Sequence, residues 1–145
     1  MPEPKGSSDN HVGASILVVD DSDAIRKVVC AMLTQNGYTC LEACNGAEAL
    51  SFLRTGAKIH LVLTDVAMPR MGGAELAAYL VREYPSLPIL FMSGYTDNPM
   101  VRAIEQTPIF LPKPFTASAL TTTVRRALEQ PWSGLPGWCF GSCSL

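Results

Sequence analysis

The chain has 145 residues, of which 48% are hydrophobic and 17% charged, and its formal net charge is −2. This length suits one domain with a substantial core. The small negative charge gives no basic footprint for a nucleic-acid partner, and no apolar run approaches the roughly 20 residues that span a bilayer. The opening segment MPEPKGSSDN is no signal peptide, so we expect a cytoplasmic protein without a membrane partner.

Residues 1–14 are rich in Pro, Gly, Ser and Asp and have no periodicity, which predicts a disordered leader. The apolar run 16–19 predicts a first strand, which leads directly into Asp20 and Asp21. A helix follows over 25–33, because apolar residues recur there at helical spacing. Ser22 is placed to cap this helix.

Strands and helices continue to alternate up to residue 130. Further strands are predicted at 38–43, 61–65, 87–92 and 109–111, and further helices at 45–53, 74–84, 100–105 and 116–128. Asn45 and Thr116 are the expected caps of two of these helices. The alternation predicts a parallel sheet with helices on both faces. Residues 131–145 break the pattern and are expected to form an irregular tail.

The five cysteines are an odd number, and Cys30, Cys40 and Cys44 fall within helix and strand patterns. In a cytosolic protein this usage favours buried, reduced thiols over a disulfide framework. Cys139 and Cys143 stand alone, with neither a second pair nor a His nearby, so we expect no zinc site.

Asp65 ends the central predicted strand, in the segment HLVLTDVAMPRMGG over 60–73. The carboxyl end of a parallel strand borders the ligand crevice of an open α/β sheet. By position alone, Asp65 is a helix cap, a metal ligand or a nucleophile. Polar residues also follow the first, fourth and fifth predicted strands: Asp20, Asp21, Ser93 and Lys113.

Three carboxylates at one sheet edge raise one another's pKa unless a cation is present. Mg²⁺ suits such a site, because it takes one or two carboxylates, a carbonyl and waters, and leaves positions for phosphate oxygens. An Asp nucleophile, a metal, a Lys and a Ser hydroxyl together match phosphoryl transfer.

Four motifs, VVDDS, TDVAMPRMGG, MSGYTD and LPKPF, occur in this order and together resemble the receiver domain of two-component response regulators. The resemblance covers residues 15–130 and is closest to receivers attached to hybrid sensor histidine kinases. It implies a flavodoxin-like, doubly wound sheet of five parallel strands in the order 2-1-3-4-5. It also implies a signalling switch, which catalyses only its own phosphorylation and dephosphorylation.

By this resemblance Asp65 accepts the phosphoryl group from a sensor histidine kinase or a histidine phosphotransfer protein. Mg²⁺ would be bound by Asp21, Asp65 and the backbone carbonyl of Ala67, with Asp20 acting through water.

The resemblance also implies that Ser93 and Lys113 each contact a phosphoryl oxygen. Phe110 stands where the family keeps an aromatic that changes rotamer on activation, although an aromatic in a buried strand is often plain core. The output would pass to a downstream protein target, with no nucleic acid bound.

Two departures and one rival class qualify this interpretation. Twenty positions separate Ser93 from Lys113, a little fewer than is usual for the family, so the helix over 100–105 is expected to be short or mobile. Nothing after residue 130 reads as an output domain, so a single-domain receiver is expected. The alternative is a haloacid-dehalogenase-like phosphatase, in which Asp21 would be the nucleophile and Asp23 the general acid.

Overall fold

The computed structural model describes residues 13–66, 68, 71–94, 107, 109–130 and 132. Its strands are β1 (Ser15–Val19), β2 (Thr39–Ala43), β3 (Leu61–Asp65), β4 (Ile89–Ser93) and β5 (Phe110–Pro112). Its helices are α1 (Asp23–Gln35), α2 (Gly46–Arg54), α3 (Gly73–Glu83) and α5 (Ala117–Glu129).

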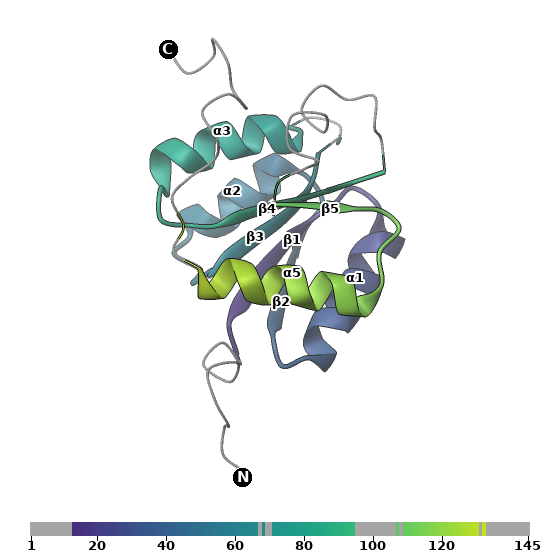
Figure 1. Ribbon diagram of the computed structural model, residues 1–145. Helices are drawn as coiled ribbons and strands as arrows, with labels where there is room; N and C mark the ends of the chain where they lie inside the picture. The colour runs from purple at the N-terminus through teal and green to yellow at the C-terminus, as the bar shows by residue number, and fades with distance from the viewer. Residues whose placement is uncertain are drawn as a thin grey trace.

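All neighbouring strands pair in parallel, in one sheet of order β2-β1-β3-β4-β5. Helices α2 and α3 cover one face of this sheet, and α1 and α5 cover the other (Figure 1). The predicted flavodoxin-like architecture and strand order are therefore confirmed.

The two central strands are buried along their whole length, which explains why they read as apolar runs without alternation. All five residues of β3 and all five of β4 are buried. On β1, Leu17 and Val19 face α2 and α3, whereas Ile16 and Val18 face α1 and α5. The core is thus two apolar layers separated by the sheet.

Side-chain caps fix where α1, α2 and α5 begin. Each predicted cap accepts a hydrogen bond from the backbone N–H three residues later: Ser22 (3.3 Å), Asn45 (2.8 Å) and Thr116 (3.0 Å). These bonds satisfy amide groups that a helix leaves without partners at its start. The predicted caps are therefore confirmed, and they set the direction in which each helix leaves the edge of the sheet.

Several predicted boundaries differ from the observed ones. The strand predicted over 87–92 is Ile89–Ser93 in the structure, because the preceding Pro88 has no N–H for the ladder. The strand predicted over 109–111 is likewise Phe110–Pro112. The predicted leader up to residue 12, the helix predicted over 100–105, and residues 133–145 lie outside the described residues.

The cysteine prediction is partly wrong. Cys30, Cys40 and Cys44 are free thiols as expected, but Cys44 is exposed. The reason is that β2 ends at Ala43, so Cys44 lies in the turn that leads into α2. Across the described ranges, no helix combines the length and apolar character of a membrane span.

Candidate functional site

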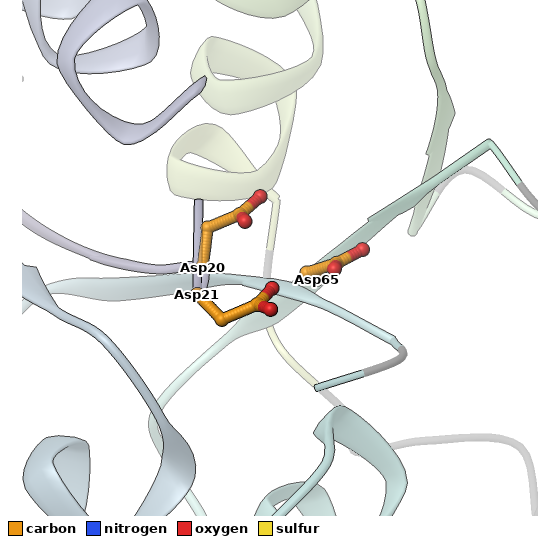
Figure 2. Close-up of side chains that lie close together, drawn as sticks. All are labelled: Asp20, Asp21 and Asp65. Carbon is orange, nitrogen blue, oxygen red and sulfur yellow. The ribbon is translucent and has the colours of Figure 1, made fainter. Parts of the chain in front are cut away.

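Three carboxylates gather at the carboxyl edge of the sheet. Asp20 and Asp21 follow β1, and Asp65 is the last residue of β3. These strands are neighbours, with Val19 opposite Thr64. One carboxylate oxygen from each aspartate lies within 4.8 Å of the others, and Figure 2 shows the three side chains close together beyond the strand ends. The convergence expected from the sequence is therefore present.

Asp20 is the most firmly held of the three. Its side chain is buried, with one oxygen accepting a hydrogen bond from the backbone N–H of Ser22 at 2.8 Å. The other oxygen accepts from the ammonium of Lys113 at 3.0 Å. Asp21, by contrast, is exposed to solvent. The site therefore has a fixed, buried side and an open side.

Lys113 joins the last strand to this cluster. Its Nζ lies 3.0 Å from Asp20 Oδ2 and 3.4 Å from Asp65 Oδ1. Its backbone N–H donates to the carbonyl of Ser93 at 3.0 Å, which ties the end of β5 to the end of β4. The structure thus brings an ammonium group from β5 between carboxylates from β1 and β3.

The environment of Asp65 disfavours its charged form. Burial raises the pKa of Asp65 to about 6, the charges of Asp20 and Asp21 act in the same direction, and Lys113 opposes them. The single positive charge of Lys113 therefore offsets only part of the negative charge of the three carboxylates. The converging oxygen donors suit a hard divalent cation such as Mg²⁺, which also favours the ionised form of the carboxylates.

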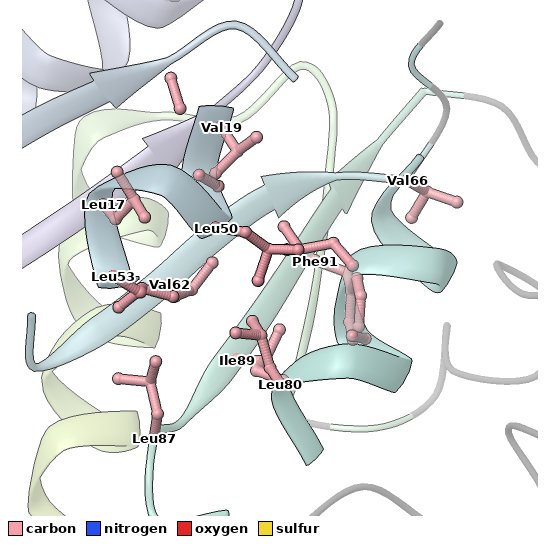
Figure 3. Packing of buried hydrophobic residues seen from close by; sticks show 14 residues of the cluster. Leu17, Val19, Leu50, Leu53, Val62, Val66, Leu80, Leu87, Ile89 and Phe91 are labelled. Atoms are coloured by element: carbon pink, nitrogen blue, oxygen red, sulfur yellow. The ribbon is translucent and has the colours of Figure 1, made fainter. Parts of the chain in front are cut away.

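Ser93 lies on β4, the strand next to Asp65, and Phe110 lies on β5, one strand further out. Ser93 ends β4 and is buried. Phe110 begins β5, pairs with Phe91 of β4, and is partly exposed. It packs against the core cluster under α2 and α3, whose members include the labelled Phe91 and Leu80 (Figure 3). The remaining predicted site residue, Ala67, lies outside the described residues.

Gly73 allows the loop after Asp65 to close tightly. Its N–H donates to the carbonyl of Val66 at 2.9 Å, and a Cβ at this position would lie 2.4 Å from the carbonyl oxygen of Asp65. Only glycine lets α3 begin this close to the strand. The second glycine of the motif TDVAMPRMGG thus has a steric role beside the site.

Arg26 supports the acidic cluster and was not among the predicted site residues. It lies on the buried face of α1, where its Nη1 donates to the backbone carbonyl of Asp20 at 2.7 Å. Its Nε donates to Glu42 of β2 at 2.9 Å, and it also pairs with Asp23. The available signal was its helical spacing with Val29 and Leu33, which puts a charged residue on the buried stripe.

Comparison with protein-family models matches residues 16–125 to the response regulator receiver domain. Among curated proteins, the chain is 38% identical over 120 residues to the sensor kinase CckA of Brucella abortus, covering 81% of this chain and 13% of the kinase. It is 35% identical over 116 residues to the DNA-binding transcriptional regulator NtrC of Escherichia coli K12, covering 79% of this chain and 24% of the regulator. The chain therefore spans less than a third of either relative.

Solved structures of similar size match along almost their whole length. The chemotaxis response regulator CheY4 of Vibrio cholerae aligns with a TM-score of 0.70 at 32% identity, covering 80% of this chain and 99% of that protein. The receiver domain of NtrX from Brucella abortus aligns with a TM-score of 0.71 at 33% identity, covering 79% of this chain and 98% of that domain.

Proposed function

This chain belongs to the response regulator receiver family, and from that premise we propose that it is a signalling switch in which Asp65 accepts a phosphoryl group. The supporting observation is the convergence of Asp20, Asp21 and Asp65, with the ammonium of Lys113 bonded to two of them. The donor would be the phosphohistidine of a sensor histidine kinase or of a histidine phosphotransfer protein.

In the proposed reaction, an ionised oxygen of Asp65 attacks the phosphorus atom. A P–O bond forms, and the P–N bond to the donor histidine breaks, with its electron pair returning to the imidazole. Lys113 is placed to donate a hydrogen bond to a phosphoryl oxygen while Asp20 holds its ammonium in position. The buried Ser93 hydroxyl, at the end of the neighbouring strand, would contact a second oxygen.

Mg²⁺ would be held by Asp21, Asp65 and the backbone carbonyl of Ala67, with Asp20 acting through water. When bound, it would supply positive charge to the carboxylates and to the phosphoryl oxygens. The raised pKa of Asp65 supports this assignment, because a buried carboxylate with acidic neighbours needs more positive charge than Lys113 provides. Hydrolysis of the acyl phosphate would use the same residues: water would attack the phosphorus, and the P–O bond to Asp65 would break to release phosphate and the carboxylate.

Labelling with acetyl phosphate tests the assignment of Asp65. We expect the wild type in Mg²⁺ to gain one phosphoryl group by intact mass, and expect no gain in Asp65→Asn or when the metal is chelated. Glu75→Gln is the matched control, since it removes one exposed carboxylate outside the cluster.

The same experiment separates the phosphatase alternative. If Asp21 were the nucleophile, Asp65→Asn would still form the adduct and peptide mapping would find it on Asp21. The family match favours Asp65, and nothing in the comparisons supports the phosphatase.

Phe110 is the proposed route by which phosphorylation alters the surface. Its strand is paired with the strand that ends at Ser93, and its ring is only partly buried. If a phosphoryl oxygen draws the Ser93 hydroxyl inward, the Phe110 ring can occupy the space that the hydroxyl leaves. Because Phe has no hydroxyl to hold it outward, the inward rotamer should already be populated, and phosphorylation would shift that population.

Aromatic NMR with a beryllofluoride mimic of the phosphoryl group tests this route. We expect the Phe110 ring signals to move on mimic binding and the signals of Tyr38, which packs in the apolar layer on the other face of the sheet, to stay in place. Phe110→Tyr should show a smaller shift in population, because its hydroxyl favours the outward ring. Static Phe110 signals beside a shifted Ser93 would make Phe110 an ordinary core residue.

The proposal also includes a cytoplasmic location, a downstream protein target, and a functional unit over residues 15–130. The leader over 1–14 and the tail over 131–145 are assigned no part in phosphoryl transfer.

A further inference from the structure

Two thiols face each other between α1 and β2, away from the acidic site. Cys30 lies on the buried face of α1, and Cys40 lies on β2. The Cys40 Sγ is 3.8 Å from the backbone carbonyl oxygen of Cys30, which places the two cysteines in contact where the helix packs on the strand. Both sulfurs belong to the same apolar layer, under α1 and α5.

The register of the two elements holds this pair in place. Cys30 is one helical turn after Arg26, and Cys40 is two residues before Glu42, so each cysteine shares a face with one partner of an ion pair. Arg26 Nε bonds Glu42 Oε1 at 2.9 Å across the same helix–strand contact. The packing of α1 on β2, together with this ion pair, therefore holds the two cysteine positions side by side.

We propose that Cys30 and Cys40 form a reversible disulfide when the protein meets a peroxide, which would link α1 covalently to β2. In the first step the Cys30 thiolate attacks a peroxide oxygen, the O–O bond breaks, and hydroxide leaves with formation of a sulfenic acid. In the second step the Cys40 sulfur attacks the Cys30 sulfur. The S–S bond forms, the S–O bond breaks, and the departing hydroxide takes the Cys40 proton to give water.

The electrostatics assign different roles to the two sulfurs. The neighbouring Cys40 thiol lowers the pKa of the Cys30 thiol, and the charges of Lys27 and Arg26 act in the same direction, whereas burial and Glu42 oppose them. The neighbouring Cys30 thiol, together with burial, raises the pKa of Cys40. Since the thiolate is the nucleophile, Cys30 reacts first. Cys40 then attacks the sulfenic acid as it loses its proton to the departing hydroxide.

Cys44 provides an internal control. It is exposed, and its pKa is raised by its hydrogen bond with Glu48. It shares neither the helix contact nor the lowered pKa of Cys30, so accessibility alone would favour reaction at Cys44, whereas the geometry favours the internal pair.

The test uses the full chain, reduced with dithiothreitol, desalted, treated with hydrogen peroxide and then alkylated. Trypsin leaves all three thiols on one peptide, 28–54, so cleavage after Tyr38 and Leu41 with chymotrypsin is needed to separate them. We expect a cross-linked peptide pair carrying Cys30 and Cys40, which dithiothreitol releases. The link should form equally in Cys44→Ala and be absent from Cys40→Ala.

A thermal measurement accompanies the mapping. The oxidised wild type should melt higher than the reduced protein by about 5 °C or more, because closing a short loop restricts the unfolded chain. Cys40→Ala should show no such difference between the two treatments. The proposal is wrong if peroxide leaves Cys30 and Cys40 open to alkylation, oxidises them to sulfinic acid, or pairs either of them with Cys44, Cys139 or Cys143. Mapping of the wild type decides this even if a variant fails to fold.

Discussion

The buried carboxylate of Asp65 makes the stability of the metal-free protein depend on pH. Its pKa rises from an ordinary value of 3.8 to about 6 in the folded chain. Between these values the folded state holds a proton that the unfolded state has lost. This contribution to the free energy of unfolding therefore decreases as pH rises from about 4 to about 6, by up to about 3 kcal/mol.

Asp65→Asn should remove this penalty. In metal-free buffer we expect the variant to have a free energy of unfolding about 2 kcal/mol above that of the wild type at pH 7.5, and to lack its decline between about pH 4 and 6. Urea unfolding of both proteins across this range measures the difference. Glu75→Gln should behave as the wild type does, and an equal decline in Asp65→Asn would mean that other groups cause it.

Among single residues, the meeting of Asp20, Asp65 and Lys113 could be predicted from the sequence. Each lies at or just after the end of an apolar strand, and the carboxyl ends of parallel strands share one edge of the sheet. The sequence did not identify Arg26. The role of Arg26 depends on Glu42 and on the carbonyl of Asp20, which reach it only when β2 packs beside α1. A helical pattern gives the face of a residue but not the partners that other elements bring to that face.

At the scale of the elements, the first residues of α2 and α3 offer a matched pair of glycines. A Cβ on Gly73 would meet the carbonyl oxygen of Asp65 at 2.4 Å, whereas a Cβ on Gly46 would meet the side chain of Met71 at 2.6 Å. The backbone of β3 cannot move without disturbing the sheet. At Gly46 the Cγ and Sδ of Met71 can rotate away, and only the Met71 Cβ, at 2.9 Å, requires a small backbone shift.

We therefore expect Gly73→Ala to lower the free energy of unfolding by about 3 kcal/mol, and Gly46→Ala by about 1–2 kcal/mol. Because the strain falls on Asp65, only Gly73→Ala should also slow labelling by acetyl phosphate. Urea unfolding and intact mass measure the two effects. Equal losses in the two variants would show that the loop after β3 adapts more easily than its geometry indicates.

The order of the elements was predictable because strand and helix patterns alternate, and a parallel sheet requires such crossovers. The first and last residues of each strand were less predictable. The N–H of Val62 donates to the carbonyl of Pro88 at 3.0 Å, so this proline belongs to the pairing edge although it precedes β4. Exposure of Cys44 was missed for a similar reason: a local pattern does not say where pairing with β1 stops.

At the scale of the whole molecule, Trp132 shows that the packed unit extends past α5. Its ring is partly buried and packs against the core cluster under α2 and α3, although residues 131–145 have the composition of an irregular tail. Aromatic burial of this kind contributes about 1–2 kcal/mol. We therefore propose that the folding unit includes Trp132, beyond the unit 15–130 expected from the sequence.

Two truncations test this boundary. Deleting residues 133–145 should leave the melting temperature and the phosphorylation of Asp65 close to those of the full chain. Deleting 131–145 should lower the free energy of unfolding by about 1–2 kcal/mol, because Trp132 is then lost as well. Trp132→Ala in the full chain should reproduce that loss. If the shorter deletion already prevents folding, the tail is part of the core.

The bond between Lys113 and Asp20 joins residues 93 positions apart. This separation determines when the site forms. Closing so long a loop costs chain entropy that the packing of the intervening elements must repay first. A nascent chain that ends before β5 carries the three carboxylates without the ammonium between them. We therefore expect a newly made chain to accept a phosphoryl group only when β5 has joined the sheet. A kinase in the same compartment would then not phosphorylate chains that are still being synthesised.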